Sequence, residues 1–234
     1  MKGIVSIVLI AMLAVLVYSK PTRGVLGAKG GEKGIRLPYD AEVEYLESTA
    51  EGQYIDTGIT PDSTTVWELD FSFNTTVKGQ YSGSGNGMYD GRAVPNRFNM
   101  GVDSGKFRCA YGGLWFDVAE LVDTGRHLWR LSALGARRAE ASIDSGEPAY
   151  VNIPANFTPT SPICIYRRVV SDLKYAGKLF GSKIWQTGVL RRDFIPVRFT
   201  NESGQSEGAM YDRVSGQLYR NQGTGAFLYG PDKN

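Results

Sequence analysis

The sequence has few residues that bind metals or form cross-links, with two cysteines and one histidine among 234 residues. Structural zinc sites use about four Cys or His ligands, so this composition excludes one. Cys109 and Cys164 both lie in strand-like stretches. Export would permit a disulfide between them, but two buried free thiols are the favoured interpretation. His127 directly precedes Leu128 and Trp129, which favours a structural role at the start of a strand.

The chain also lacks a strong excess of charge. It carries 26 basic and 24 acidic residues, a net charge of +2. A nucleic-acid-binding surface needs basic residues in excess and gathered on one face. We therefore predict that the partner is not a nucleic acid.

Long apolar runs are absent except at the N-terminus. Residues 3–18 contain no charge and follow Lys2. This pattern is typical of a secretory signal, and the run is short for a membrane span. We interpret residues 1–19 as a signal peptide or an uncleaved N-terminal anchor, and the Gly- and Lys-rich residues 20–40 as a flexible linker. The chain is then secreted, periplasmic or on the cell surface, and it touches a membrane only through an uncleaved N-terminal segment.

No convincing helical period follows residue 40. The clearest pattern is Val66–Phe73, where Trp67, Leu69, Phe71 and Phe73 alternate with polar residues. Strict alternation predicts a strand with one buried and one wet face. We predict further strands at Arg97–Val102, Lys106–Tyr111, His127–Leu134, Arg138–Ile143, Ile163–Arg168, Leu179–Gln186 and Val189–Val197.

Turn signals punctuate these strands. Asp103-Ser104-Gly105 predicts a hairpin, as does Gly135. Prolines at 148, 154, 159 and 162 predict a long irregular connection, and at most one helical turn is expected, near Gly112–Val118 or Tyr166–Tyr175. Short strands at regular spacing predict an all-β, two-sheet antiparallel sandwich.

Three separated parts of the chain resemble a known family: Glu42–Ile59, residues 177–185 with Leu190–Arg198, and residues 208–230 with the motif GAMYDRVSGQLYRNQGTGAFLYG. They are similar to a bacterial family of laminin-G-like, concanavalin A-like domains found in surface proteins of the Verrucomicrobia–Lentisphaerae type. The resemblance implies a jelly-roll domain over residues 41–231 in a bacterial protein, but no fixed activity. Within the last segment, Asp212 and Ser215-Gly216 are residues that a tight turn uses.

Glu68-Leu69-Asp70 is the best catalytic candidate. It resembles the first half of the catalytic strand of laminarinase-type glycan hydrolases, which share this fold. Retaining hydrolysis needs two carboxyl groups about 5 Å apart. The second glutamate of that strand motif is missing, because Ser72 and Phe73 occupy its place. We therefore interpret Glu68 and Asp70 as acids on a wet strand face, and we predict no catalytic residues.

A sugar site would combine exposed aromatic rings with polar groups, and two loops offer both. One contains Trp115 and Asp117, and the other contains Tyr89, Asp90 and Arg92. Trp67, Trp129 and Trp185 lie inside strand patterns, which predicts that they belong to the core. No cofactor is indicated. Calcium is a candidate through Asp90, Asp103 and Asp117, although no calcium-loop spacing is present.

Three functions are consistent with these features. The favoured one is an exported, lectin-like surface module that binds a carbohydrate or cell-surface glycan without catalysis. The second is a structural or adhesive surface protein with no small ligand. The third is a glycan hydrolase, which would need a second carboxylate near Glu68 from another strand.

Overall fold

A computed structural model describes residues 37–234, except 50–51, 75–79, 85–95, 121–122 and 168–175. The predicted signal or anchor at residues 1–19, and the linker up to residue 36, lie outside the described residues. In the part that is described, no helix is long and apolar enough to cross a membrane.

Every regular element among the described residues is a β-strand, and all strand pairs are antiparallel. The larger sheet holds eleven of these strands in the order β11-β10-β9-β4-β13-β14-β15-β16, with β1 beside β14, β2 beside β13 and β17 beside β2. Its strands are β1 (Ala41–Glu42), β2 (Leu46–Thr49), β4 (Val66–Phe73), β9 (His127–Ala133), β10 (Arg138–Ile143), β11 (Ala149–Asn152), β13 (Ala176–Gln186), β14 (Val189–Thr200), β15 (Ser206–Asp212), β16 (Gln217–Tyr219) and β17 (Leu228–Tyr229).

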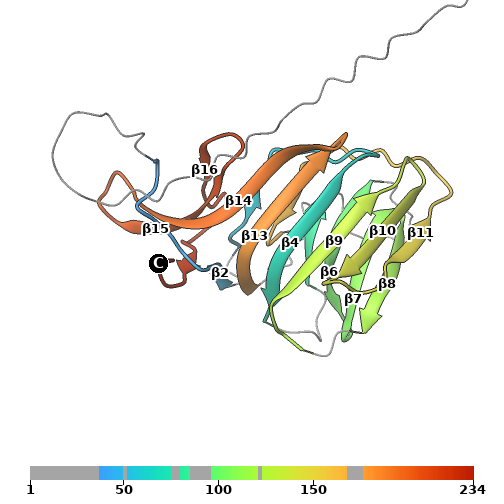
Figure 1. Cartoon of the computed structure of the whole chain (residues 1–234), viewed down its shortest axis with the longest axis horizontal. Helices are drawn as coiled ribbons and strands as arrows, with labels where there is room; N and C mark the ends of the chain where they lie inside the picture. The colour runs from blue at the N-terminus through green and yellow to red at the C-terminus, as the bar shows by residue number, and fades with distance from the viewer. Residues whose placement is uncertain (1–36, 50–51, 75–79, 85–95, 121–122, 168–175) are drawn as a thin grey trace, which may run out of the picture. The chain divides into compact units, whose positions relative to one another are not determined.

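The smaller sheet holds the remaining six strands in the order β3-β12-β5-β6-β7-β8. They are β3 (Ile55–Asp56), β5 (Gln80–Ser84), β6 (Arg97–Asp103), β7 (Lys106–Gly112), β8 (Leu114–Glu120) and β12 (Cys164–Ile165). The chain crosses between the sheets after β2, β3, β4, β8, β11 and β12. Figure 1 shows β13, β4, β9 and β10 side by side, with β6, β7 and β8 in the layer behind them. The result is the jelly-roll sandwich that the sequence predicts.

Alternation along β4 builds the centre of the core. Trp67, Leu69, Phe71 and Phe73 are all buried, while Glu68 and Asp70 on the other face are only partly covered. Trp129 of β9 packs between them and the small sheet, with its ring centroid 5.2 Å from that of Phe73 and 4.5 Å from that of Phe107. Edge-to-face aromatic pairs of this kind add about 0.5–1.5 kcal/mol each beyond their buried area.

The predicted hairpins are present. β6 and β7 pair through a two-residue turn in which Ser104 and Gly105 have φ values of 54° and 76°. Two consecutive positive φ values are the signature of a type I′ turn, whose twist matches that of the strands. β9 and β10 also pair around Gly135, which has a φ of 109°.

Several stretches differ from the sequence prediction. The strand predicted at Ile163–Arg168 is represented by the two residues of β12, Cys164–Ile165, because Tyr166 has a φ of 68°, which ends the extended conformation.

Leu114–Glu120 forms strand β8, so the first of the two places expected for a helical turn, Gly112–Val118, is wrong. Most of the other, Tyr166–Tyr175, lies outside the described residues. Every third residue of β8 is exposed and the others are partly covered. The sequence therefore lacks the alternation of apolar and polar residues by which a strand is recognised. The proline-rich connection contains β11, an edge strand that pairs only with β10.

Cys109 and Cys164 are buried free thiols. Cys164 on β12 is opposite Gly83 on β5, and Cys109 on β7 is opposite Met100 on β6. β12 and β7 are therefore three strand spacings apart, about 14 Å. A disulfide requires Cα atoms within about 7 Å, so the structure excludes a Cys109–Cys164 bond.

Trp67 and Trp129 belong to the core, as predicted, but Trp185 does not. Ile184 is fully buried opposite Trp67, and the next residue, Trp185, therefore faces away from the core and is only partly covered. The sequence could not separate the two faces here because bulky residues occupy both positions. An aromatic ring thus lies on the outer face of the large sheet, the face turned away from the small sheet.

Candidate functional site

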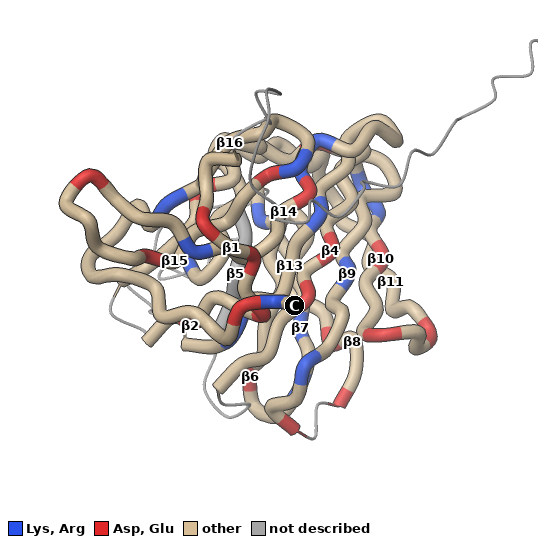
Figure 2. Tube along the Cα trace, turned by 60° about the vertical axis from the view of Figure 1, so that its left-hand side comes forward, with Lys and Arg blue, Asp and Glu red and all other residues tan. Residues whose placement is uncertain are grey.

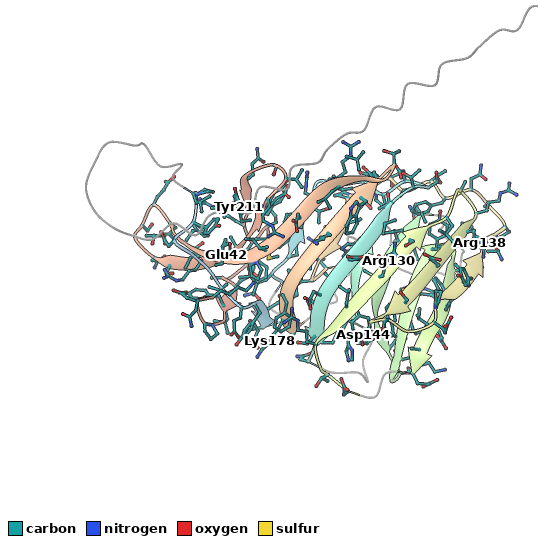
Figure 3. All side chains as sticks on the ribbon, in the orientation of Figure 1. Glu42, Arg130, Arg138, Asp144, Lys178 and Tyr211 are labelled. Carbon is teal, nitrogen blue, oxygen red and sulfur yellow. The ribbon has the colours of Figure 1, made fainter. Side chains whose placement is uncertain are left out.

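The outer face of the large sheet carries a row of charged side chains that crosses four strands. Strand register places Arg130 of β9 beside Glu68 of β4, Glu68 beside Lys183 of β13, and Lys183 beside Asp193 of β14. We call these four residues the polar row. Figure 3 shows Arg130 near the middle of this face. Figure 2 shows acidic and basic positions interspersed along the chain, rather than separated into large regions of one sign.

A hollow of about 240 Å³ opens on the same face, across β9, β4, β13 and β14. Its residues are Glu68, Asp70, Leu128, Phe180, Gly181, Ser182, Lys183, Asp193, Phe194, Ile195 and Arg213. Gly181 pairs with Asp70 at a bulge in β13. Because alternation points the Cβ position of Gly181 outward, the absence of a side chain there leaves space that a larger residue would fill.

Arginines hold the three carboxylates of the hollow. Arg126 donates to both oxygens of Asp70, at 2.8 and 2.6 Å. Arg213 donates twice to Oδ2 of Asp193, at 2.7 and 3.0 Å. Arg130 lies 3.6 Å from Oε1 of Glu68. These pairs fix the carboxylates in place, which is what a binding surface needs before a ligand arrives.

Several polar groups of the hollow are still available to a ligand. Among the described residues, none forms an ion pair with Lys183, and none donates a hydrogen bond to Oε2 of Glu68 or to Oδ1 of Asp193. The hollow therefore offers one ammonium donor and two carboxylate acceptors within a single row. A hydroxyl group both donates and accepts, so a polyhydroxylated molecule matches this arrangement.

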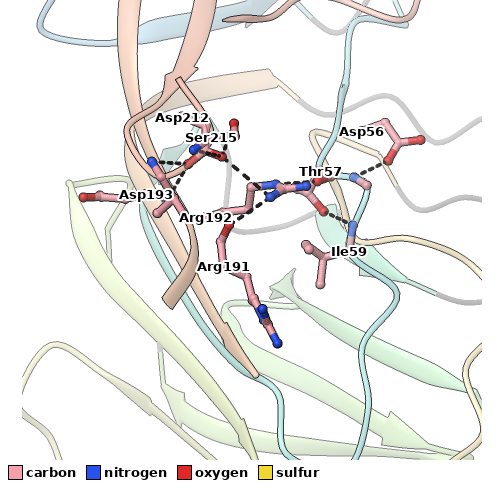
Figure 4. Close-up of polar contacts among 10 residues, drawn as sticks. Asp56, Thr57, Ile59, Arg191, Arg192, Asp193, Asp212 and Ser215 are labelled. Carbon is pink, nitrogen blue, oxygen red and sulfur yellow. Dashed lines mark hydrogen bonds and ion pairs between the residues drawn. The ribbon is translucent and has the colours of Figure 1, made fainter. Parts of the chain in front are cut away.

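The position of Asp193 depends on the buried carboxylate of Asp212, to which its backbone is hydrogen-bonded (Figure 4). Asp212 is completely buried, and it accepts hydrogen bonds from the backbone N–H of Asp193, Val214 and Ser215 at 2.8, 3.1 and 3.2 Å. The Ser215 hydroxyl donates to it at 2.6 Å. Asp212 thus closes the turn between β15 and β16 and ties that turn to β14.

An arginine extends this network to the loop after β3. Arg192 lies 3.7 Å from Asp212 and donates to the carbonyl oxygen of Thr57 at 2.9 Å. Figure 4 shows it between the two. The network joins the end of the large sheet to a strand end of the small sheet, so it fixes one side of the hollow relative to the sandwich.

The catalytic candidates Glu68 and Asp70 do line the hollow, but their geometry does not favour hydrolysis. Both oxygens of Asp70 are bound by Arg126. The second carboxylate from another strand is Asp193, two strand spacings from Glu68, or about 10 Å between the backbones. Lys183 stands between them. An inverting hydrolase needs about 6.5–9.5 Å with room for water between the carboxyl groups, and here a lysine occupies that position.

The predicted sugar site divides between two places. Trp115 and Asp117 lie on β8, at the edge of the small sheet, and Trp115 is partly covered with the Arg97 guanidinium 5.7 Å from its ring centre. Tyr89, Asp90 and Arg92 lie outside the described residues. The structure therefore describes only the β8 half of this prediction.

Asp103 and Asp117, two of the three candidate calcium ligands, already form ion pairs with basic side chains of the protein. Arg108 lies 3.1 Å from Asp103 and 2.7 Å from Asp117, and Lys106 lies 3.0 Å from Asp117. Within the described ranges, no cluster of three or more His, Cys, Asp or Glu side chains could hold a metal ion. Asp90, the third candidate, is outside those ranges.

His127 has the structural role that the sequence predicts. It begins β9, and its two ring nitrogens lie 2.9 Å from Asp144 and 3.0 Å from Asp123. Burial lowers the pKa of His127, but the contacts with Asp144 and Asp123 outweigh that effect, and the net pKa is above its ordinary value of 6.5. The protonated ring, which donates from both nitrogens, is the form that fits between two carboxylates.

We expect the stability of the protein to fall as pH rises from about 6.5 through the higher pKa of folded His127. A raised folded-state pKa stabilises the protein below the unfolded-state pKa, and that stabilisation is lost above the folded one. Urea unfolding between pH 5.5 and 8.5 measures this. Because His127 is the only histidine, His127→Gln should flatten the profile. An unchanged slope in the variant would contradict the assignment.

Lys183, Asp193, Arg213 and Gly181 also belong to the hollow, and no local sequence pattern marks them as site residues. Glu68 and Asp70 were visible because they alternate with apolar residues on one strand. The others come from strands more than 100 residues further along the chain, and only strand register brings them together.

No protein-family model matches the chain, and no curated protein matches it significantly in sequence. Among solved structures, the chain is similar to the Ruminococcus gnavus IT-sialidase CBM40 bound to alpha2,3 sialyllactose, with a TM-score of 0.46 and 10% identity over 62% of this chain and 89% of that chain. A second structure of the Ruminococcus gnavus IT-sialidase CBM40 gives a TM-score of 0.44 and 11% identity over the same shares. Likeness at this level does not assign a function.

Proposed function

We propose that this protein is a non-catalytic carbohydrate-binding module, and that a sugar ring docks in the hollow on the outer face of the large sheet. The observation that carries the proposal is the set of unsatisfied groups there: the Lys183 ammonium beside free oxygens of Glu68 and Asp193, all held in register by three strands. Alternating donors and acceptors match the hydroxyl groups of a sugar. Leu128 and Phe180 add apolar surface against which the ring's C–H groups can pack.

The family and location proposed from the sequence fit this function. A laminin-G-like, concanavalin A-like module exported by the N-terminal segment meets glycans outside the cell. We propose that the module needs no calcium, because Asp103 and Asp117 already pair with Arg108 and Lys106. Mass spectrometry of the N-terminus of the protein after expression in a bacterial host tests export, since cleavage after Ser19 is the expected result.

A glycan array probed with the purified protein tests the function. We expect reproducible binding to a neutral or weakly charged glycan class, unchanged by a calcium chelator and without release of cleaved sugar. Lys183→Ala should weaken binding about 10- to 100-fold, since hydrogen bonds to charged groups contribute about 1.5–3 kcal/mol.

The matched variants are Trp115→Ala and Lys106→Ala, which remove the aromatic ring and the ammonium of the β8 face. Both should bind like the unmodified protein. Loss of binding in these variants, with Lys183→Ala unaffected, would move the site to the small sheet. No binding across the array would favour the adhesive function instead.

A further inference from the structure

A second row of side chains on the outer face lies next to the polar row. Strand register places Tyr150 of β11 beside Glu140 of β10, Glu140 beside Ser132 of β9, Ser132 beside Val66 of β4, and Val66 beside Trp185 of β13. We call these five residues the aromatic row. Its two rings are four strand spacings apart, about 19 Å.

We propose that the ligand is an extended glycan chain that lies across the strands, with one ring in the hollow and later rings on the aromatic row as far as Tyr150. This inference rests on the carbohydrate-binding function proposed above. It adds the form of the ligand, an oligosaccharide chain of several units rather than a single terminal sugar, and it assigns Tyr150 as a binding residue.

The size of the hollow supports the proposal. Pockets that enclose a drug-sized ligand measure about 300–1,000 Å³, and this hollow measures about 240 Å³. It can hold one sugar ring but not a chain. The other rings of a longer glycan must therefore lie on the surface next to it.

As far as the described residues show, one direction along the sheet is open to them. The β14–β15 side is closed by an apolar cluster in which Tyr39 and Tyr211 pack against four buried residues: Ile195, Val197, Phe199 and Ala209. On the other side, the face continues over β9, β10 and β11 with partly exposed side chains: Arg130 is 42% exposed and Tyr150 is 50% exposed. The spacing between strands is close to the length of one sugar ring, so successive rings would meet successive strands.

The aromatic row has the groups that such a chain needs. The Tyr150 ring is held by the Arg138 guanidinium, 4.9 Å from its centre, which pre-orients it for stacking. Figure 3 shows Arg138 at this end of the sheet. Ser132 lies between Tyr150 and Trp185 in this row, and the residue is 2% exposed. No group among the described residues forms a hydrogen bond with its hydroxyl. A buried hydroxyl without a partner costs about 1–3 kcal/mol, a cost that hydrogen bonding with a bound glycan would remove.

Calorimetric titration with oligosaccharides of two to six units tests the inference, using β-1,4-glucan, β-1,3-glucan and mannan series as probes on the full chain. For the series that binds, we expect affinity to rise about tenfold or more from two to six units, the gain of one good aromatic contact. Tyr150→Ala should abolish that rise and leave the affinity for the disaccharide unchanged.

Tyr229→Ala is the matched control, because Tyr229 is also an exposed tyrosine but lies on β17, which pairs with β2 and not with a strand of the aromatic row. It should bind every length like the unmodified protein. Equal affinity for two and six units, or an unchanged rise in Tyr150→Ala, would overturn the extended-chain inference and leave the hollow as a single-sugar site. No binding by any probe of any length would count against both proposals.

Discussion

Replacing Asp212 by alanine is expected to lower the free energy of unfolding by about 3–5 kcal/mol, because breaking a buried pair leaves its partners without compensation. Asp212 is fully buried and accepts four hydrogen bonds. Its removal leaves three backbone N–H groups without a hydrogen-bond acceptor. It also takes away the carboxylate that lies 3.7 Å from the Arg192 guanidinium. Urea unfolding followed by tryptophan fluorescence measures the change.

Two further variants separate the roles of charge and hydrogen bonding. Asp212→Asn keeps one acceptor oxygen but loses the charge, so we expect a smaller loss than with alanine. Glu120→Ala removes a carboxylate that is 74% exposed and 3.2 Å from Lys106, and surface pairs contribute about 0–1 kcal/mol. If Asp212→Ala were no more destabilising than Glu120→Ala, the proposed role of Asp212 in closing the β15–β16 turn would be wrong.

Only one of the two roles of Asp212 can be predicted from the residues next to it in the sequence. The aspartate followed by Ser215-Gly216 predicts a tight turn, and the structure contains that turn, with Gly216 at a φ of 71°. The local pattern does not predict that the same carboxylate also accepts the N–H of Asp193, which lies 19 residues earlier in the chain. Turn chemistry is set by neighbours in sequence, whereas this second contact is set by pairing between β14 and β15.

The same distinction explains which elements could be predicted. Val66–Phe73 and Arg138–Ile143 match their predicted bounds, because each has one wet and one buried face or clear turn residues at its ends. β8 was missed because its exposure repeats every three residues. β13 was predicted to begin at Leu179 but begins at Ala176. Gly177 gives no strand signal in the sequence, but the close approach of the Ser72 carbonyl oxygen leaves no room for a side chain there.

The candidate site could be predicted only in part for a related reason. Glu68 and Asp70 were identified as a wet face, and the structure places both at the hollow. The structure also places two cations, Arg126 and Lys183, beside these carboxylates. Glu68 and Asp70 are therefore not the open carboxylate pair that hydrolysis would need. Trp185 was assigned to the core from its strand pattern, yet a shift of one position puts it on the outer face of the large sheet. Side-chain facing depends on register, which a single sequence does not determine where both faces carry bulky residues.

Filling the hollow from its floor is expected to abolish sugar binding without unfolding the protein. Gly181 has an ordinary strand conformation, and the heavy atom closest to its Cβ position is the carbonyl oxygen of Phe194 at 3.4 Å, a normal van der Waals distance. Gly181→Leu should therefore fold, while its side chain occupies the space between Asp70 and Lys183. We expect affinity for the array's best glycan to fall at least about 100-fold, equivalent to about 2.7 kcal/mol. Gly181→Ala, which adds one carbon, should have an intermediate effect.

Ser72→Leu is the matched control for this result. Ser72 faces the same side of β4 as Asp70 but lies outside the hollow, so the variant adds similar apolar bulk to the same sheet without blocking the site. Calorimetric binding and urea unfolding of both variants then give a clear comparison. Full binding by a folded Gly181→Leu variant would show that the sugar docks elsewhere on the molecule. Loss of binding in Gly181→Leu alone, with both variants stable, is the outcome expected if the shape of this hollow selects the ligand, since the substitution changes volume and leaves every charged group of the polar row in place.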